Sequence, residues 1–123
     1  MGREIQKNQK KPFFLYLPLP LPHLSLQAPE DEILAYQGKF PETIYTSSKG
    51  GYVPTKYPRA TYAAMITYLD KQVGRIIETL KKYQIDENTL IMFSSDNGAT
   101  FDVGGVDTQF FNSVAGLRGR KQD

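Results

Sequence analysis

The apolar positions of the chain predict two buried strands with one long helix between them. Residues 13–17 form an aromatic and aliphatic run bounded by prolines, and residues 90–93 form a second apolar run without polar alternation. Such runs are typical of strands covered on both faces, as parallel strands between helices are. Between the runs, apolar side chains recur at three- and four-residue steps, which predicts a helix with one buried stripe. The stripe consists of Tyr62, Met65, Ile66, Leu69, Val73, Ile76, Ile77 and Leu80.

The order of strand, long excursion with a helix, and strand predicts an α/β crossover unit. Pro58 suits the first turn of the helix, and Lys81 with Lys82 suits its negative end. A crossover of this kind is right-handed and joins parallel strands. We therefore expect the polar segments that follow the two strands to emerge at the same edge of the sheet, where sheets of this class bind ligands.

The rest of the chain is predicted to consist of short helices and loops. Residues 1–11 are polar and lysine-rich, which indicates the end of a surface helix or a loose tail. Alternate prolines make residues 18–29 an extended loop, because proline disfavours both a helix and a central strand. Residues 29–40 favour a short helix, and residues 41–56 favour a long exposed loop. The segment after the second strand has no period and is predicted to be loop.

Candidate chemistry lies just after the two predicted strands. Asp96 and Asn97 follow the second strand, and an Asp carboxylate with an Asn carbonyl supplies the hard oxygen donors that calcium or magnesium binds. The alternative is a plain turn, because Asp-Asn-Gly is also common turn chemistry. His23, the single histidine, lies in the loop after the first strand. Its alternative is a surface residue without a special role, as is usual for a lone histidine in a loop.

Composition and charge narrow the class of protein. The chain has 123 residues, of which 40% are hydrophobic and 23% are charged, as in an ordinary globular domain. A formal net charge of +2 with scattered lysines argues against a nucleic-acid partner. The absence of cysteine excludes disulfides, thiolate metal sites and a cysteine nucleophile within this sequence. No run is long enough to span a membrane, so we expect no membrane partner. Prolines interrupt the one stretch that imitates a signal peptide.

Four segments are informative as a set, because of their order and spacing. They are Phe13-Phe14-Leu15-Tyr16-Leu17 with Pro22-His23, the helix around Leu69-Asp70 and Val73-Gly74, Ser94-Ser95-Asp96-Asn97-Gly98, and Leu117-Arg118-Gly119-Arg120-Lys121. Together they resemble the sulfatase family, most closely its arylsulfatase B-like members, over nearly all of the chain. The four pieces resemble the family's histidine loop, its next helix, its metal-binding strand end and its lysine loop.

The resemblance implies an α/β fold like that of alkaline phosphatase, partial in this chain, with mostly parallel strands covered by helices. It also implies a calcium-dependent hydrolase of sulfate esters, aryl or glycan, that uses a formylglycine made from cysteine. In that scheme Asp96 and Asn97 ligate calcium, while His23 and Lys121 hold the sulfate oxygens and stabilise developing charge. Family members are usually secreted, periplasmic or lysosomal, and the sequence leaves the compartment undecided.

The sequence also departs from the family pattern. It has no Cys-x-Pro-Ser-Arg motif, none of the amino-terminal aspartates that complete the metal site, and no glycine-rich continuation after Lys121. We therefore expect residues 1–123 to be a single partial catalytic domain, its middle segment, with an incomplete calcium site and no nucleophile. The alternatives are a non-catalytic module that binds a sulfated ligand or a protein, and a phosphoester hydrolase of the same superfamily. Open edges of the predicted strands also indicate self-association.

Overall fold

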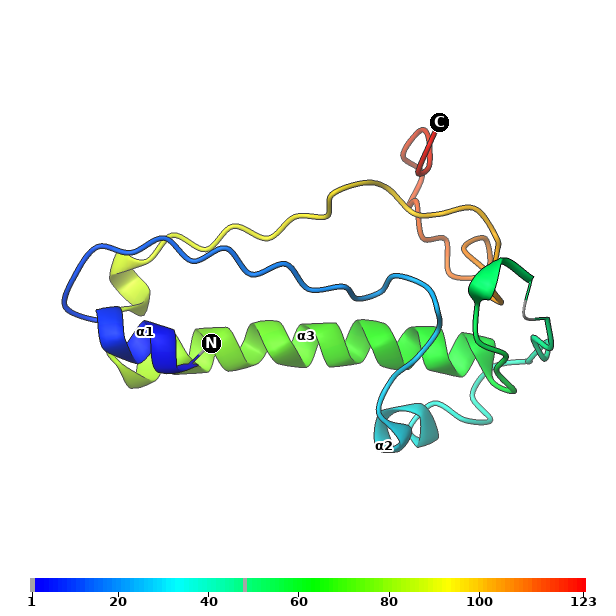
Figure 1. Cartoon of the computed structure of the whole chain (residues 1–123), viewed down its shortest axis with the longest axis horizontal. Coiled ribbons are helices and arrows are strands. Elements are labelled where there is room, and N and C mark those ends of the chain that lie inside the picture. Colours follow the sequence, from blue (N-terminus) through cyan, green and yellow to red (C-terminus); the bar gives the residue numbers. More distant parts are fainter. Residues whose placement is uncertain (1, 48) are drawn as a thin grey trace.

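Helix α3 (Pro58–Lys82) runs along most of the length of the molecule, and the other segments are arranged beside it (Figure 1). The computed structural model describes residues 2–47 and 49–123. Helices α1 and α2 and the 3-10 helix η2 all contact α3, which makes the long helix the scaffold of the fold. Within these described residues the shorter helices are α1 (Gly2–Asn8), α2 (Glu30–Leu34), η1 (Lys49–Gly51) and η2 (Asp86–Asn88).

The long helix has the limits that its sequence predicts. Pro58 occupies its first turn, and two lysines lie in its last turn, where they oppose the negative end of the helix dipole. Its first backbone N–H groups lack partners within the helix and are capped from a distant loop. The two carboxylate oxygens of Glu42 accept hydrogen bonds from the N–H groups of Arg59 and Ala60, both at 2.9 Å. The predicted helix is confirmed, and Glu42 adds a cap that the local sequence does not indicate.

The apolar stripe of α3 is only partly buried. Met65 and Leu80 are 1% and 2% exposed, whereas Ile66 is 42% exposed. Met65 packs with Leu26 and Val106 in the main apolar cluster. This cluster joins α3 to the loop after the first apolar run and to the segment after the second apolar run. The expectation that the whole stripe is core is therefore wrong, because the segments around α3 cover only part of its circumference.

The two apolar runs are extended, but they form no strands. Residues 13–17 and 90–93 run in the same direction, opposite to α3, on one side of that helix in Figure 1. Within residues 2–47 and 49–123 the only β-bridge is a single antiparallel pair, Tyr45 with Thr55, and no backbone hydrogen bond joins the two runs. The predicted parallel strand pairing is therefore not confirmed.

Several side chains of these runs face solvent. Phe14, Leu90 and Met92 are 93%, 86% and 84% exposed, whereas strands in a doubly covered sheet bury both faces. A strand is held by neighbours at its edges, and a sheet of fewer than three strands is marginal without further packing. Helices covering both faces of the runs are therefore not confirmed, and the exposed side chains agree with the open flanks expected of a partial domain.

The remaining segments follow their predictions in part. Helix α1 is the surface helix that residues 1–11 indicate, with residue 1 outside the described residues, and its Ile5 side chain is almost fully buried. Helix α2 is shorter than the helix predicted over residues 29–40, and turns follow it. Residues 41–56 form the predicted long loop, which also contains η1 and the bridge between Tyr45 and Thr55, and position 48 in it is not described. No described helix is both long enough and apolar enough to cross a membrane.

Candidate metal and anion site

Asp96 and Asn97 lie at a bend that follows the second apolar run, and both are exposed. The Nδ2 group of Asn97 donates a hydrogen bond to the carbonyl oxygen of Gly98 at 2.9 Å. That bond uses the amide nitrogen and leaves the Oδ1 atom available as an acceptor or ligand. The Asp96 carboxylate has no hydrogen bond or ion pair to another described residue. Two kinds of oxygen donor are thus available side by side in the sequence at this bend.

The loop that carries Lys121 returns to this bend. The backbone N–H of Lys121 donates a hydrogen bond to the carbonyl oxygen of Ala99 at 2.8 Å. A Cβ atom built on Gly98 would lie 3.8 Å from the Cα atom of Arg120, which is an ordinary van der Waals contact. The lysine loop therefore lies against the residues that directly follow the Asp-Asn pair.

His23 is exposed, and its ring Nδ1 lies 2.6 Å from the carbonyl oxygen of Leu24. A proton on Nδ1 donates to that carbonyl, so Nε2 of the neutral ring is an acceptor, and only the imidazolium form donates from Nε2 as well. The loop around His23 packs against the segment that follows the bend, because the Leu24 side chain lies 3.3 Å from where a Cβ atom on Gly104 would be. In the described part of the chain, no hydrogen bond or ion pair joins His23 to the other three candidate residues.

The oxygen atoms of Asp96 and Asn97 are of the kind that calcium binds, but they are too few to complete a calcium site. Calcium takes about six to eight oxygen ligands, and the Asp-Asn pair supplies only the first of them. Among the described residues, no group of three or more His, Asp or Glu side chains is arranged to hold a metal ion. The bend is thus at most half of a metal site.

An ion pair that the sequence analysis does not predict, between Arg59 and Asp107, holds two loops beside the start of α3. The Nη2 and Nε groups of Arg59 donate to one carboxylate oxygen of Asp107 at 2.6 and 3.2 Å, and its Nη1 group donates to the carbonyl oxygen of Pro41 at 2.5 Å. The guanidinium also lies 4.0 Å above the ring of Phe110. The hydrogen bond from Arg59, followed by one from the Phe110 N–H, lowers the pKa of Asp107. The sequence holds one indirect signal, because an arginine in the first turn of a helix lies at the positive end of the helix dipole and is unfavourable there without an acidic partner.

The pair Gly104-Gly105 holds the long loop of residues 41–56 close to the segment after the bend. Both glycines have positive φ values, +62° and +88°. A Cβ on Gly104 would lie 3.0 Å from the ring of Tyr52, and one on Gly105 would lie 2.9 Å from the Cβ atom of Tyr45. Glycine is therefore required here by backbone conformation and by close packing.

Comparison with known proteins supports the resemblance described above. Residues 1–121 match the sulfatase family. The chain is 30% identical over 129 residues to an uncharacterized sulfatase of Schizosaccharomyces pombe, a match that covers 76% of this chain and 23% of that protein. It is 36% identical over 80 residues to an arylsulfatase of Klebsiella aerogenes, covering 65% of this chain and 14% of that protein. It is 35% identical over 95 residues to arylsulfatase J of Mus musculus, covering 77% of this chain and 13% of that protein.

The chain spans less than a quarter of the length of each of these relatives, 23% at most. The family match nevertheless extends over almost all of its residues and includes the segments around all four candidate site residues. The chain therefore belongs to the sulfatase family.

Proposed function

We propose that residues 1–123 are part of one catalytic domain, of the alkaline phosphatase-like α/β fold, that hydrolyses sulfuric esters. The family match over residues 1–121 supports the reaction class. The observation that carries the site is the hydrogen bond from the Lys121 N–H to the Ala99 carbonyl oxygen, at 2.8 Å. That bond holds the lysine loop, which is positively charged, against the bend that carries Asp96 and Asn97. A site that binds a sulfate anion beside a metal cation requires such an arrangement.

In this proposal the Asp96 carboxylate and the Asn97 Oδ1 atom are two of the calcium ligands, and other segments and water supply the rest. A bound calcium ion would polarise the sulfate oxygens as a Lewis acid. Lys121 acts as a compact positive charge for the sulfate group. His23 donates to sulfate through Nε2 when its ring is protonated, because Nδ1 is engaged with the Leu24 carbonyl oxygen.

The nucleophile is proposed to come from outside this sequence. The chain has no cysteine, so it cannot itself form the formylglycine on which the proposed reaction depends. We expect no turnover of an aryl sulfate by this chain alone, because nothing in it replaces the covalent nucleophile. Turnover that persists after His23 and Lys121 are both replaced would contradict the proposed roles.

The decisive experiment joins this sequence to a cysteine-bearing sulfatase segment and compares matched nitrophenyl sulfate and nitrophenyl phosphate. Lys121→Ala should lower kcat/KM for the sulfate by about 100- to 1,000-fold, the range for losing one group that stabilises developing charge. Lys81→Ala is the matched control, because Lys81 is an exposed lysine near the far end of α3. Equal effects of the two substitutions would refute the role of Lys121.

The same assay separates the two alternatives. Faster hydrolysis of the phosphate ester than of the sulfate ester would favour a phosphoester hydrolase of the same superfamily. Binding of sulfate without turnover, in the presence of formylglycine, would favour a non-catalytic module for sulfated ligands. Hydrolysis of sulfated glycans alongside aryl sulfates would define which class of sulfate ester the site accepts.

A further inference from the structure

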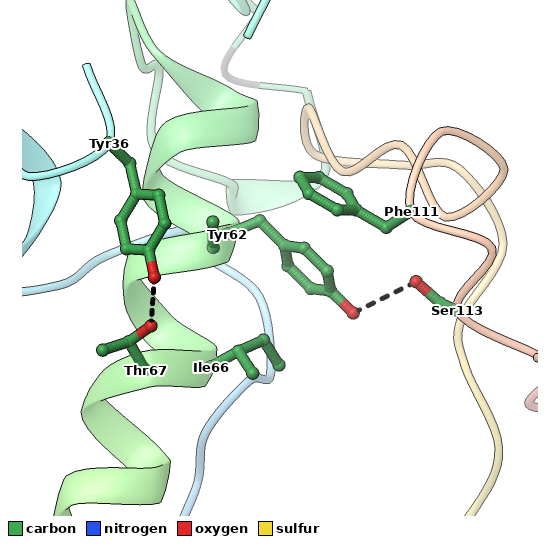
Figure 2. Close-up of a pocket in the computed structure, with 7 residues that line it drawn as sticks. Tyr36, Tyr62, Ile66, Thr67, Phe111 and Ser113 are labelled. Atoms are coloured by element: carbon green, nitrogen blue, oxygen red, sulfur yellow. Dashed lines mark hydrogen bonds between the residues drawn. The ribbon is translucent and has the colours of Figure 1, made fainter. Parts of the chain in front are cut away.

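A pocket of about 410 Å³ opens beside the amino-terminal half of α3 (Figure 2). Three parts of the chain that are distant in sequence form its walls, namely the turns after α2, the exposed side of α3 and the loop before the carboxyl end. None of the four residues of the proposed ester site is among the described residues that line it. The residues used below are Tyr36, Tyr62, Ile66, Thr67, Phe111 and Ser113.

The walls combine aromatic rings with hydroxyl groups, and none of the described lining residues is charged. The hydroxyl groups of Tyr36 and Thr67 are 2.6 Å apart and form a short hydrogen bond. The hydroxyl groups of Tyr62 and Ser113 are 3.5 Å apart, at the outer limit of hydrogen bonding. Figure 2 shows these two pairs on different sides of the pocket. The long pair can exchange its weak bond for bonds to a ligand at little cost, because each hydroxyl both donates and accepts.

The aromatic wall is fixed in place by its neighbours. The ring of Phe111 lies 5.2 Å from Tyr62, 5.0 Å from Phe110 and 5.5 Å from Phe40, measured between ring centroids. The contacts with Phe110 and Phe40 are edge-to-face, a favourable geometry for aromatic pairs. Phe110 in turn lies under the guanidinium of Arg59. The pocket is therefore formed before any ligand binds, which lowers the cost of binding.

We infer that this pocket binds one uncharged sugar ring. The volume lies in the range of small-ligand sites. A pyranose ring has an apolar face of C–H groups and several hydroxyl groups. These match the aromatic surface and the paired hydroxyls, with the C–H face against Tyr62 and Phe111 and the hydroxyls toward Ser113. An anion finds no cation among the described lining residues, and a bare aromatic ligand leaves the hydroxyl pair unused. The inference is independent of ester hydrolysis, because it concerns different residues and requires no sulfate.

The test is an NMR titration of the whole chain with methyl β-galactopyranoside, with benzyl alcohol and sodium sulfate as comparison ligands. The expected result is saturable shifts at Ile66 and Thr67 with a dissociation constant on the order of 1 to 10 mM, as for a single small ligand. Tyr62→Phe and Ser113→Ala should each weaken binding by about 3- to 10-fold, the worth of one hydrogen bond. Tyr68→Phe is the matched control, since Tyr68 is on α3 but does not line the pocket, and it should leave affinity unchanged.

Circular dichroism of each variant shows whether α3 remains helical, and Tyr62→Phe keeps the ring while removing only the hydroxyl. The inference is overturned if the galactoside gives no saturable shifts, or if benzyl alcohol binds at least as tightly. It is also overturned if neither hydroxyl substitution weakens binding by more than the Tyr68→Phe control does. Saturable shifts with sodium sulfate at the same residues would equally refute an uncharged ligand.

Discussion

The ion pair between Arg59 and Asp107 should contribute stability that depends on pH. Its shortest distance is 2.6 Å, and the two side chains are 19% and 31% exposed, so water screens the pair less than it screens a surface pair. We expect a coupling free energy of about 1 to 2 kcal/mol near neutral pH, above the usual range of exposed pairs. The perturbation is a double-mutant cycle of Arg59→Met and Asp107→Asn, which removes the charges separately and together.

The single substitutions should differ in size. Arg59→Met also removes the hydrogen bond to the Pro41 carbonyl oxygen and the contact with the Phe110 ring. It should lower the free energy of unfolding by about 2 to 3 kcal/mol, against about 1 to 2 kcal/mol for Asp107→Asn. The control cycle uses Lys7 and Glu4, whose side chains are 68% and 57% exposed and whose coupling should stay below about 0.5 kcal/mol.

The direction of the pH dependence follows from the lowered pKa of Asp107. Arg59 holds that pKa below the ordinary value of 3.8, so the folded state favours the carboxylate more than the unfolded state does. The contribution is therefore present above the unfolded-state pKa, is complete by about pH 5, and is lost as the pH falls through the folded-state pKa. Urea unfolding followed by far-ultraviolet circular dichroism at about pH 7 and about pH 2 measures it. A coupling at about pH 7 no larger than that of the control pair, or a coupling that is larger at about pH 2 than at about pH 7, would refute the reasoning.

Three further outcomes are expected. Titration calorimetry should detect at most weak calcium binding by this chain, because the Asp-Asn pair supplies few of the six to eight oxygens that calcium takes; submicromolar affinity that disappears in Asp96→Ala would contradict this. Gly105→Ala should lower the free energy of unfolding by about 2 to 4 kcal/mol, since the new Cβ would lie 2.9 Å from Tyr45. Gly116→Ala, with φ +79° but nothing within 4 Å, should cost only about 1 kcal/mol, and equal losses would mean that the contact with Tyr45 is unimportant. Light scattering should report self-association at high micromolar concentration, and Leu90→Lys should reduce it by charging an exposed apolar run; a monomeric wild-type chain would show that the runs do not associate.

The sequence indicates which residues are candidates for the site, but it does not indicate how they are arranged in space. The sequence points to Asp96, Asn97 and His23 through their places after the two apolar runs, and to Lys121 through the family resemblance, and the roles of all four remain predictions. The lysine loop meets the bend through a long-range backbone hydrogen bond, from Lys121 to Ala99, and through the contact between Gly98 and Arg120. Motifs specify side-chain types, whereas the distance between two loops depends on everything that packs between them.

The sequence by itself determined helix α3, because a helix is encoded by side chains three and four positions apart and by residues at its own ends. It also determined the family, through short motifs in a fixed order. Only the tertiary structure decided that the two apolar runs stay unpaired, since a strand exists through hydrogen bonds to a neighbour and not through its own pattern. The tertiary structure also decided three other features, namely the Glu42 cap, the bonds of Arg59 to two loops and the aromatic pocket. Each joins groups far apart in the chain, and no local period of the sequence records such a contact.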